Sequence, residues 1–137
     1  MGPDALKQVL LNLVQNGREA YVGWANKPPG PARVTIDVAR SDGEIRIEVT
    51  DNGPGIPETI ISRIFDPFFT TKEAVHGVGL GLFVAEGLVR TAGGKIMAGN
   101  KTPSGDGQSG AWFRIELPVA PRMTQRAEDT IQSVQRT

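Results

Sequence analysis

The chain has 137 residues, and its 15 lysines and arginines balance its 15 aspartates and glutamates. This zero net charge argues against a nucleic-acid-binding protein that relies on a basic face. The absence of cysteine and the single histidine exclude disulfides, thiolate metal sites and histidine-cluster metal sites. The length predicts one domain. With 17 glycines, the chain exceeds the usual share of about 7%, so either turns or a binding site must account for the excess.

The first predicted element is an amphipathic helix over residues 4–22, because apolar residues recur there at three- and four-residue steps. A proline-rich loop ends it. Two strands with alternating apolar residues follow, and the Ser41-Asp42-Gly43 turn joins them as a hairpin. Their apolar residues are Val34, Ile36, Val38, Ile45, Ile47 and Val49.

The rest of the chain predicts a short helix over 58–65, an irregular stretch over 66–79 and a long helix over 80–92 that Gly93-Gly94 ends. Two more strands are predicted at 95–99 and 112–119. We therefore expect an α+β two-layer sandwich, with a mixed β-sheet and about three helices on one face. We expect one domain over 1–120, followed by a polar, disordered tail or linker over 121–137.

No apolar run approaches the ~20 residues that cross a bilayer, and the N-terminus lacks a signal-peptide pattern. These absences predict an intracellular protein.

A first glycine cluster directly follows the strand that ends at Asp51. One interpretation is an ordinary turn, since Asp-x-Gly is common turn chemistry. In the other, the Asp51 carboxylate accepts a hydrogen bond from an exocyclic amine such as that of adenine. Gly53 and Gly55 would then let the backbone approach a planar ligand.

A second cluster, Gly77, Gly79 and Gly81, leads into the predicted helix over 80–92. Free N–H groups and the positive end of a helix favour phosphate there. The spacing matches neither the Rossmann nor the Walker pattern, and a flexible connector is the alternative.

Asn12 and Asn16 lie one turn apart on the first predicted helix. They are expected either to make an inter-helix hydrogen bond or to offer amide oxygens to Mg²⁺ beside phosphates. The spacing leaves both interpretations open.

Four motifs occur in a fixed order: Asn12-x-x-x-Asn16, Asp51-Asn52-Gly53-Pro54-Gly55, residues 65–72 (FDPFFTTK) and Gly77-x-Gly79-x-Gly81. Together they resemble the ATP-binding catalytic domain of bacterial sensor histidine kinases, within the superfamily that includes gyrase, Hsp90 and MutL. The resemblance runs from Leu6 to Pro118 and is nearest to the nitrogen-regulator type. It implies the Bergerat-type ATP-binding fold.

The resemblance implies roles for individual residues. Asn16 matches the asparagine that ligates Mg²⁺, Asn12 the one near the phosphates, and Asp51 the aspartate that reads the adenine amine. Gly53 and Gly55 would shape the adenine wall. Further nucleotide-binding positions lie in the phenylalanine box at the base of a lid over 70–79 and in the second glycine box: Phe68, Phe69, Thr71, Lys72, Gly77, Gly79, Leu80, Gly81 and Leu82.

The implied activity is transfer of the ATP γ-phosphate to a histidine, with Mg²⁺, in a two-component phosphorelay. The only histidine, His76, falls in the lid, and we expect it to be a lid residue and not the acceptor. Because the first motif lies close to the N-terminus, the chain is expected to be a fragment whose acceptor lies on a separate dimerisation domain. The expected partners are ATP, that domain and a response regulator receiver domain.

We expect a cytoplasmic monomer that binds no nucleic acid and makes no direct membrane contact. The parent kinase is either membrane-anchored or free, and the isolated chain is not expected to phosphorylate itself.

Two positions depart from the family pattern. Glu19 stands where many members have a basic residue, and Ala111 stands where a threonine hydroxyl is frequent.

Three rival functions compete with this one. An ATP-hydrolysing clamp is disfavoured because Asn12 stands where such enzymes carry a glutamate base. A nucleotide-sensing or partner-docking module without phosphotransfer stays open, as does a stand-alone protein kinase of the anti-sigma type.

Overall fold

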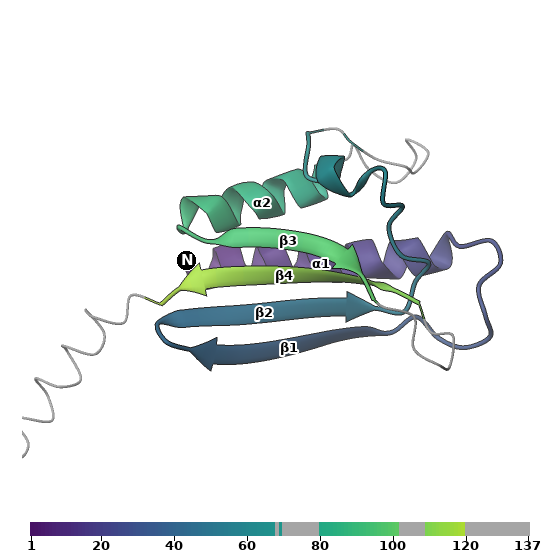
Figure 1. The fold of residues 1–137 in the computed structure, drawn as a ribbon, viewed down its shortest axis with the longest axis horizontal. Helices are drawn as coiled ribbons and strands as arrows, with labels where there is room; N and C mark the ends of the chain where they lie inside the picture. Colours follow the sequence, from purple (N-terminus) through teal and green to yellow (C-terminus); the bar gives the residue numbers. More distant parts are fainter. Residues whose placement is uncertain (68, 70–79, 102–108, 120–137) are drawn as a thin grey trace, which may run out of the picture.

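A computed structural model describes residues 1–67, 69, 80–101 and 109–119 (Figure 1). In chain order the elements are α1 (Pro3–Val22), β1 (Val34–Ser41), β2 (Glu44–Asp51), the 3-10 turn η1 (Ile61–Arg63), α2 (Gly81–Thr91), β3 (Lys95–Asn100) and β4 (Ala111–Pro118).

The long helix α1 begins where its sequence predicts. Pro3 occupies the first turn, where a missing N–H costs nothing, and Asp4 adds negative charge at that end. The helix ends at Gly23, whose N–H donates to the Glu19 carbonyl at 2.9 Å. Every fourth residue faces inward, because 3.6 residues make one turn. The buried residues are Val9, Leu13, Gly17 and Tyr21.

The predicted hairpin of β1 and β2 is confirmed, and the strands are antiparallel. Asp42 and Gly43 both have positive φ, at 35° and 77°. This conformation matches the right-handed twist of the strands, which is why Asp-Gly suits a two-residue hairpin turn.

The two-layer α+β architecture is confirmed, with α1 and α2 packed against a four-stranded sheet (Figure 1). One detail of the expectation was wrong. The sheet is antiparallel throughout, in the order β1-β2-β4-β3, and not mixed. The reason is that β4 folds back between β2 and β3, so strands that share a direction are not neighbours. The described residues also contain two α-helices and one 3-10 turn, where about three helices were expected.

In place of the predicted short helix over 58–65, the structure contains only the 3-10 turn η1. The turns around it are closed by backbone bonds between residues three apart, from Ile60 to Pro57, Arg63 to Ile60 and Asp66 to Arg63. Such bonds form 3-10 geometry, which rarely extends beyond a few residues.

The core lies between the helices and the inner face of the sheet. Phe113 and Ile115 of β4 are buried against Leu13 of α1 and Val89 of α2. The outer face carries charged pairs between neighbouring strands, Glu48 with Arg114 at 3.2 Å and Arg46 with Glu116 at 3.8 Å. The sheet therefore has one apolar and one polar face, as antiparallel sheets often have.

The edge strand β1 departs from its predicted burial. Its alternating apolar residues point to the helix side, yet Ile36 is 44% exposed and Val38 is 68% exposed. The helices pack over the centre and the other edge of the sheet, so β1 is left largely uncovered (Figure 1).

Within the part of the chain that the structure describes, no helix is long and apolar enough to cross a membrane. The predicted tail over 121–137 lies outside the described residues.

Candidate functional site

Three of the predicted motifs meet where α1 passes the start of α2 and the end of β2. The side-chain Nδ2 of Asn12 donates to the backbone carbonyl of Gly81, the first residue of α2, at 3.0 Å. Asn12 Oδ1 in turn accepts a bond from Gln8 at 2.9 Å. Of the two interpretations of this asparagine, the inter-helix hydrogen bond is the one that the structure contains. It joins the first motif to the last across 69 residues.

Asp51, the last residue of β2, is the one buried charged residue among those that the structure describes, with 6% of its surface exposed. Its Oδ1 accepts two backbone bonds, from Gly53 at 2.9 Å and from Ala111 at 3.1 Å. Both hold the carboxylate in one orientation. No donor among the described residues bonds to Oδ2, so this oxygen remains for an external donor.

Helix α1 packs directly on Asp51 through a glycine. A Cβ atom at Gly17 would lie 3.1 Å from Asp51 Cβ and 3.3 Å from its Oδ2. Glycine therefore allows the helix to approach the carboxylate closely. Asn16 lies directly before Gly17 in α1 and one helical turn after Asn12. Its place on the helix is therefore between the residue that bonds to the start of α2 and the residue that packs on Asp51.

Asn16 is half-buried, and its side chain makes no hydrogen bond with another described residue. Its amide oxygen is thus available to a ligand, in contrast to that of Asn12. Amide oxygens suit hard cations such as Mg²⁺. The described residues contain no group of three or more histidines, cysteines, aspartates or glutamates that could hold a metal by itself. A cation here would therefore need further oxygen ligands from a bound phosphate or from water.

The irregular segment after Asp51 is held by two residues that sequence reasoning missed. Ser109 Oγ donates to the Gly53 carbonyl at 2.8 Å. Asn100, the last residue of β3, bonds to both backbone polar groups of Ile56 at 2.6 Å. Neither residue belongs to one of the four motifs. The only signal in the sequence was their type, since serine and asparagine at strand ends frequently bond to backbone.

The two departures from the family pattern also have structural counterparts. Ala111 lacks a hydroxyl, yet its backbone N–H bonds to Asp51 and Ser109 supplies a hydroxyl to the same loop. Glu19 accepts a bond from Gln15 at 3.1 Å on the surface of α1.

The second glycine box is described only from residue 80 onward. Leu80 caps α2, and its carbonyl accepts the Val84 N–H at 2.8 Å. Leu82 packs against the core. Gly81 is exposed, and a Cβ there would meet no atom of the described residues within 4 Å.

Of the phenylalanine box, Phe69 is half-buried against the core, with the Arg63 guanidinium 5.0 Å from its ring centroid. The other predicted residues of the lid and glycine box lie outside the described residues: Phe68, Thr71, Lys72, His76, Gly77 and Gly79.

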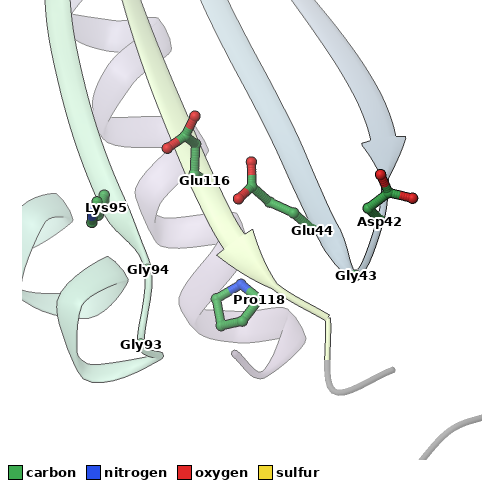
Figure 2. A pocket seen from close by; sticks show the side chains of 8 residues that line it. All are labelled: Asp42, Gly43, Glu44, Gly93, Gly94, Lys95, Glu116 and Pro118. Carbon is green, nitrogen blue, oxygen red and sulfur yellow. The ribbon is translucent and has the colours of Figure 1, made fainter. Parts of the chain in front are cut away.

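A cavity of about 220 Å³ lies at the other end of β2, beside the hairpin turn (Figure 2). Three carboxylates and one lysine line it together with backbone, and Figure 2 shows Glu44 and Glu116 on the adjacent strands β2 and β4. None of the predicted site residues borders this cavity. The predicted site residues therefore lie away from this cavity, around Asp51 and Gly81.

Comparison with known proteins shows the family to which the chain belongs. Residues 1–121 match the family described as histidine kinase-, DNA gyrase B-, and HSP90-like ATPase. The chain is 40% identical over 117 residues to the two-component sensor PprA of Pseudomonas aeruginosa, covering 85% of this chain and 12% of PprA. It is 37% identical over 130 residues to the sensory histidine kinase/phosphatase NtrB of Rhodobacter capsulatus, covering 87% of this chain and 33% of NtrB.

Among solved structures, the catalytic domain of histidine kinase ThkA superposes with a TM-score of 0.68 at 35% identity. The alignment covers 87% of this chain and 69% of the ThkA chain. The chain thus spans a third or less of the length of these curated relatives and most of an isolated catalytic domain.

Proposed function

The chain belongs to the histidine kinase-, DNA gyrase B-, and HSP90-like ATPase family, as an ATP-binding kinase domain, and we propose that it binds ATP with Mg²⁺ and donates the γ-phosphate to a histidine on a separate domain of a longer sensor kinase. The observation that supports this proposal most directly is the burial and hydrogen bonding of the Asp51 carboxylate. A buried carboxylate has one oxygen fixed by two backbone donors while the other has no donor among the described residues. This arrangement suits recognition of one external N–H group, as on the amine of adenine.

The phosphates would lie toward the N-terminal end of α2. The link from Asn12 to Gly81 holds that end against α1, and an exposed helix start favours anions because its N–H groups and dipole are positive. The exposure of Gly81, which has no described atom within 4 Å of a Cβ position, supports an approach of phosphate to the backbone. The lid residues Thr71 and Lys72 and the glycines 77 and 79 are proposed to complete this side.

The site residues fit Mg²⁺, which supplies positive charge next to the phosphates when it is bound. Asn16 is the proposed protein ligand, because its amide oxygen is uncommitted among the described residues and lies on the helix face between Asp51 and the start of α2. Mg²⁺ commonly takes one or two protein oxygens and completes its shell with phosphate and water.

In the proposed reaction the bond between the γ-phosphorus and its bridging oxygen breaks, and a bond to an imidazole nitrogen forms. A neutral imidazole nitrogen carries its own lone pair, so the domain need not supply a general base. Asn12 is consistent with the absence of a general base, because its amide cannot take up a proton. Its Oδ1 and Nδ2 are both engaged in hydrogen bonds. The domain contributes by holding the γ-phosphate of ATP in line with the attacking nitrogen and by offsetting the negative charge of the phosphates.

The proposed partners are the histidine-bearing dimerisation domain and a response regulator receiver domain. Two relatives, a two-component sensor and a sensory histidine kinase/phosphatase, support these partners. We also propose that the domain works in the cytoplasm, where ATP is available.

The test is calorimetric titration of the chain with ATP, with and without Mg²⁺. Under the proposal, the wild-type chain binds ATP, Mg²⁺ increases the affinity, and the Asp51→Asn substitution decreases it. If the wild-type chain bound no adenine nucleotide, the proposal would be wrong.

A further inference from the structure

Asn100 closes the loop that follows Asp51 by mimicking a β-bridge. Its Oδ1 accepts the Ile56 N–H at 2.6 Å, and its Nδ2 donates to the Ile56 carbonyl at 2.6 Å. The backbone sets the orientation of the amide, because an N–H requires the oxygen and a carbonyl requires the nitrogen. Nδ2 also lies 3.4 Å from Glu58 Oε1. One side chain therefore satisfies both backbone groups of a residue 44 positions away.

The neighbouring glycine is shaped around this side chain. Gly55 has φ of 86°, and a Cβ at this position would lie 2.7 Å from Asn100 Oδ1. Positive φ and the close approach both require glycine. Gly55 thus makes room for Asn100, in addition to any role facing a ligand.

Asn100 is itself held in place by β4. The Trp112 indole N–H donates to the Asn100 backbone carbonyl at 3.2 Å, and Asn100 pairs with Ala111 across the strands. The N–H of Ala111 bonds to Asp51. One strand end of the sheet therefore positions both the carboxylate and the loop beside it.

The segment Gly53–Ile56 has few other attachments among the described residues. Its N-terminal end is tied by the bonds of Gly53 to Asp51 and Ser109. Its C-terminal end is tied by Asn100, and the Ile56 side chain packs against the core. Without the Asn100 side chain, the far end of this segment would lose both of its side-chain bonds and could move relative to Asp51.

We propose that Asn100 is a positioning residue that holds Gly53–Ile56 as one wall of the nucleotide site, and so sets affinity for the adenine end of the ligand. This inference rests on the proposed function. Asn100 acts through Ile56 and Gly55 and needs no contact with the nucleotide.

The test compares Asn100→Ala and Asn100→Asp with the wild-type chain. At pH 8 the aspartate variant places a carboxylate oxygen against the Ile56 carbonyl and near Glu58, so it is expected to bind more weakly than the alanine variant. Losing two hydrogen bonds to a loop predicts about tenfold weaker binding for Asn100→Ala. Because the defect is at the adenine end, ADP and ATP should lose affinity by the same factor, with or without Mg²⁺.

Two controls separate positioning from a general loss of stability. Ile47→Val removes one methyl group from the middle of β2, where the residue is 4% exposed, and should lower stability without changing nucleotide affinity. For Asn100→Asp, lowering the pH protonates the new carboxyl, which can then donate to the Ile56 carbonyl as the amide does. The Ile56 carbonyl and Glu58 oppose the ionised form and so raise the pKa of this carboxyl. Its affinity relative to the wild type should therefore begin to recover as the pH is lowered from 8 to 5.

The outcomes are distinguishable. Failure of the wild type to bind ATP or ADP would overturn the proposed function and this inference with it. Normal binding by the wild type together with unchanged affinity in both Asn100 variants would overturn this inference alone. A loss confined to ATP, an equal loss in Ile47→Val, or no recovery of Asn100→Asp at low pH would overturn it as well.

Discussion

The side chain of Asn12 donates a 3.0 Å hydrogen bond to the carbonyl of Gly81, and so joins the middle of α1 to the first residue of α2. The glycine loop that we propose for phosphate binding thus ends, at Gly81, against the helix that carries Asn16. A movement of either helix would change the distance between the proposed magnesium ligand and the proposed phosphate site. The first prediction tests this hydrogen bond.

Asn12→Ala should loosen the start of α2. The variant loses the bond to Gly81, a net cost of about 1 kcal/mol in the free energy of unfolding. Hydrogen exchange of the Val84 amide, which bonds to Leu80, should become faster. Gln8→Ala is the matched control, because it removes the other bond of Asn12 and leaves the one to Gly81. Equal acceleration in both variants would contradict the role assigned to this link.

Asp51→Asn should fold normally but bind ATP poorly. The new amide oxygen can still accept from Gly53 and Ala111, but an N–H₂ group replaces the free Oδ2. Loss of a charged hydrogen bond costs about 1.5–3 kcal/mol, or roughly a 10- to 100-fold increase in Kd. Asp37→Asn makes the same charge change at an exposed position of β1. Unchanged affinity in Asp51→Asn would dismiss the adenine assignment.

Asn16→Ala should remove most of the benefit of Mg²⁺ to ATP binding. Stability should change little, because the side chain has no hydrogen-bond partner among the described residues. Titration with ATP in EDTA should give the wild-type Kd, whereas titration with Mg²⁺ should give a weaker one. Gln15→Ala, an exposed neighbour that bonds to Glu19, serves as the control. A variant that retained the full effect of Mg²⁺ would exclude Asn16 as the ligand.

Two helical glycines should respond in opposite ways to alanine. Gly87 on α2 has space for a Cβ, with the nearest atom 4.0 Å away, so Gly87→Ala should raise the free energy of unfolding by about 0.8–1 kcal/mol. At Gly17 the new Cβ would press on Asp51, which two backbone bonds hold. Gly17→Ala should therefore gain less, or lose stability, in urea denaturation. Equal stabilisation at both sites would show that α1 does not require glycine against Asp51.

The isolated chain should not accumulate phosphohistidine. Under the proposed function the acceptor histidine belongs to another domain, and the single histidine of this chain, His76, is expected to be a lid residue. Incubation with radiolabelled ATP and Mg²⁺ should leave no acid-labile label on the protein. Stable label that disappears in His76→Ala would instead make His76 an acceptor.

The sequence by itself determined the elements and the family. Hydrophobic periodicity is a local property, so α1, the hairpin and α2 were predicted within one or two residues of their observed ends. The Asp-Gly turn was also predictable, since few dipeptides adopt its conformation. The motifs of the proposed site were readable because a phosphate loop and a carboxylate at a strand end would impose particular residue types at short spacing.

Only the tertiary structure decided which residues hold the site together. The insertion of β4 between β2 and β3 depends on contacts across the whole chain, and it made the sheet antiparallel. The same insertion brings Ala111 to Asp51 across 60 residues and sets Asn100 against Ile56 across 44. These side-chain-to-backbone bonds have no local signature, because the two partners become neighbours only after the strands have paired.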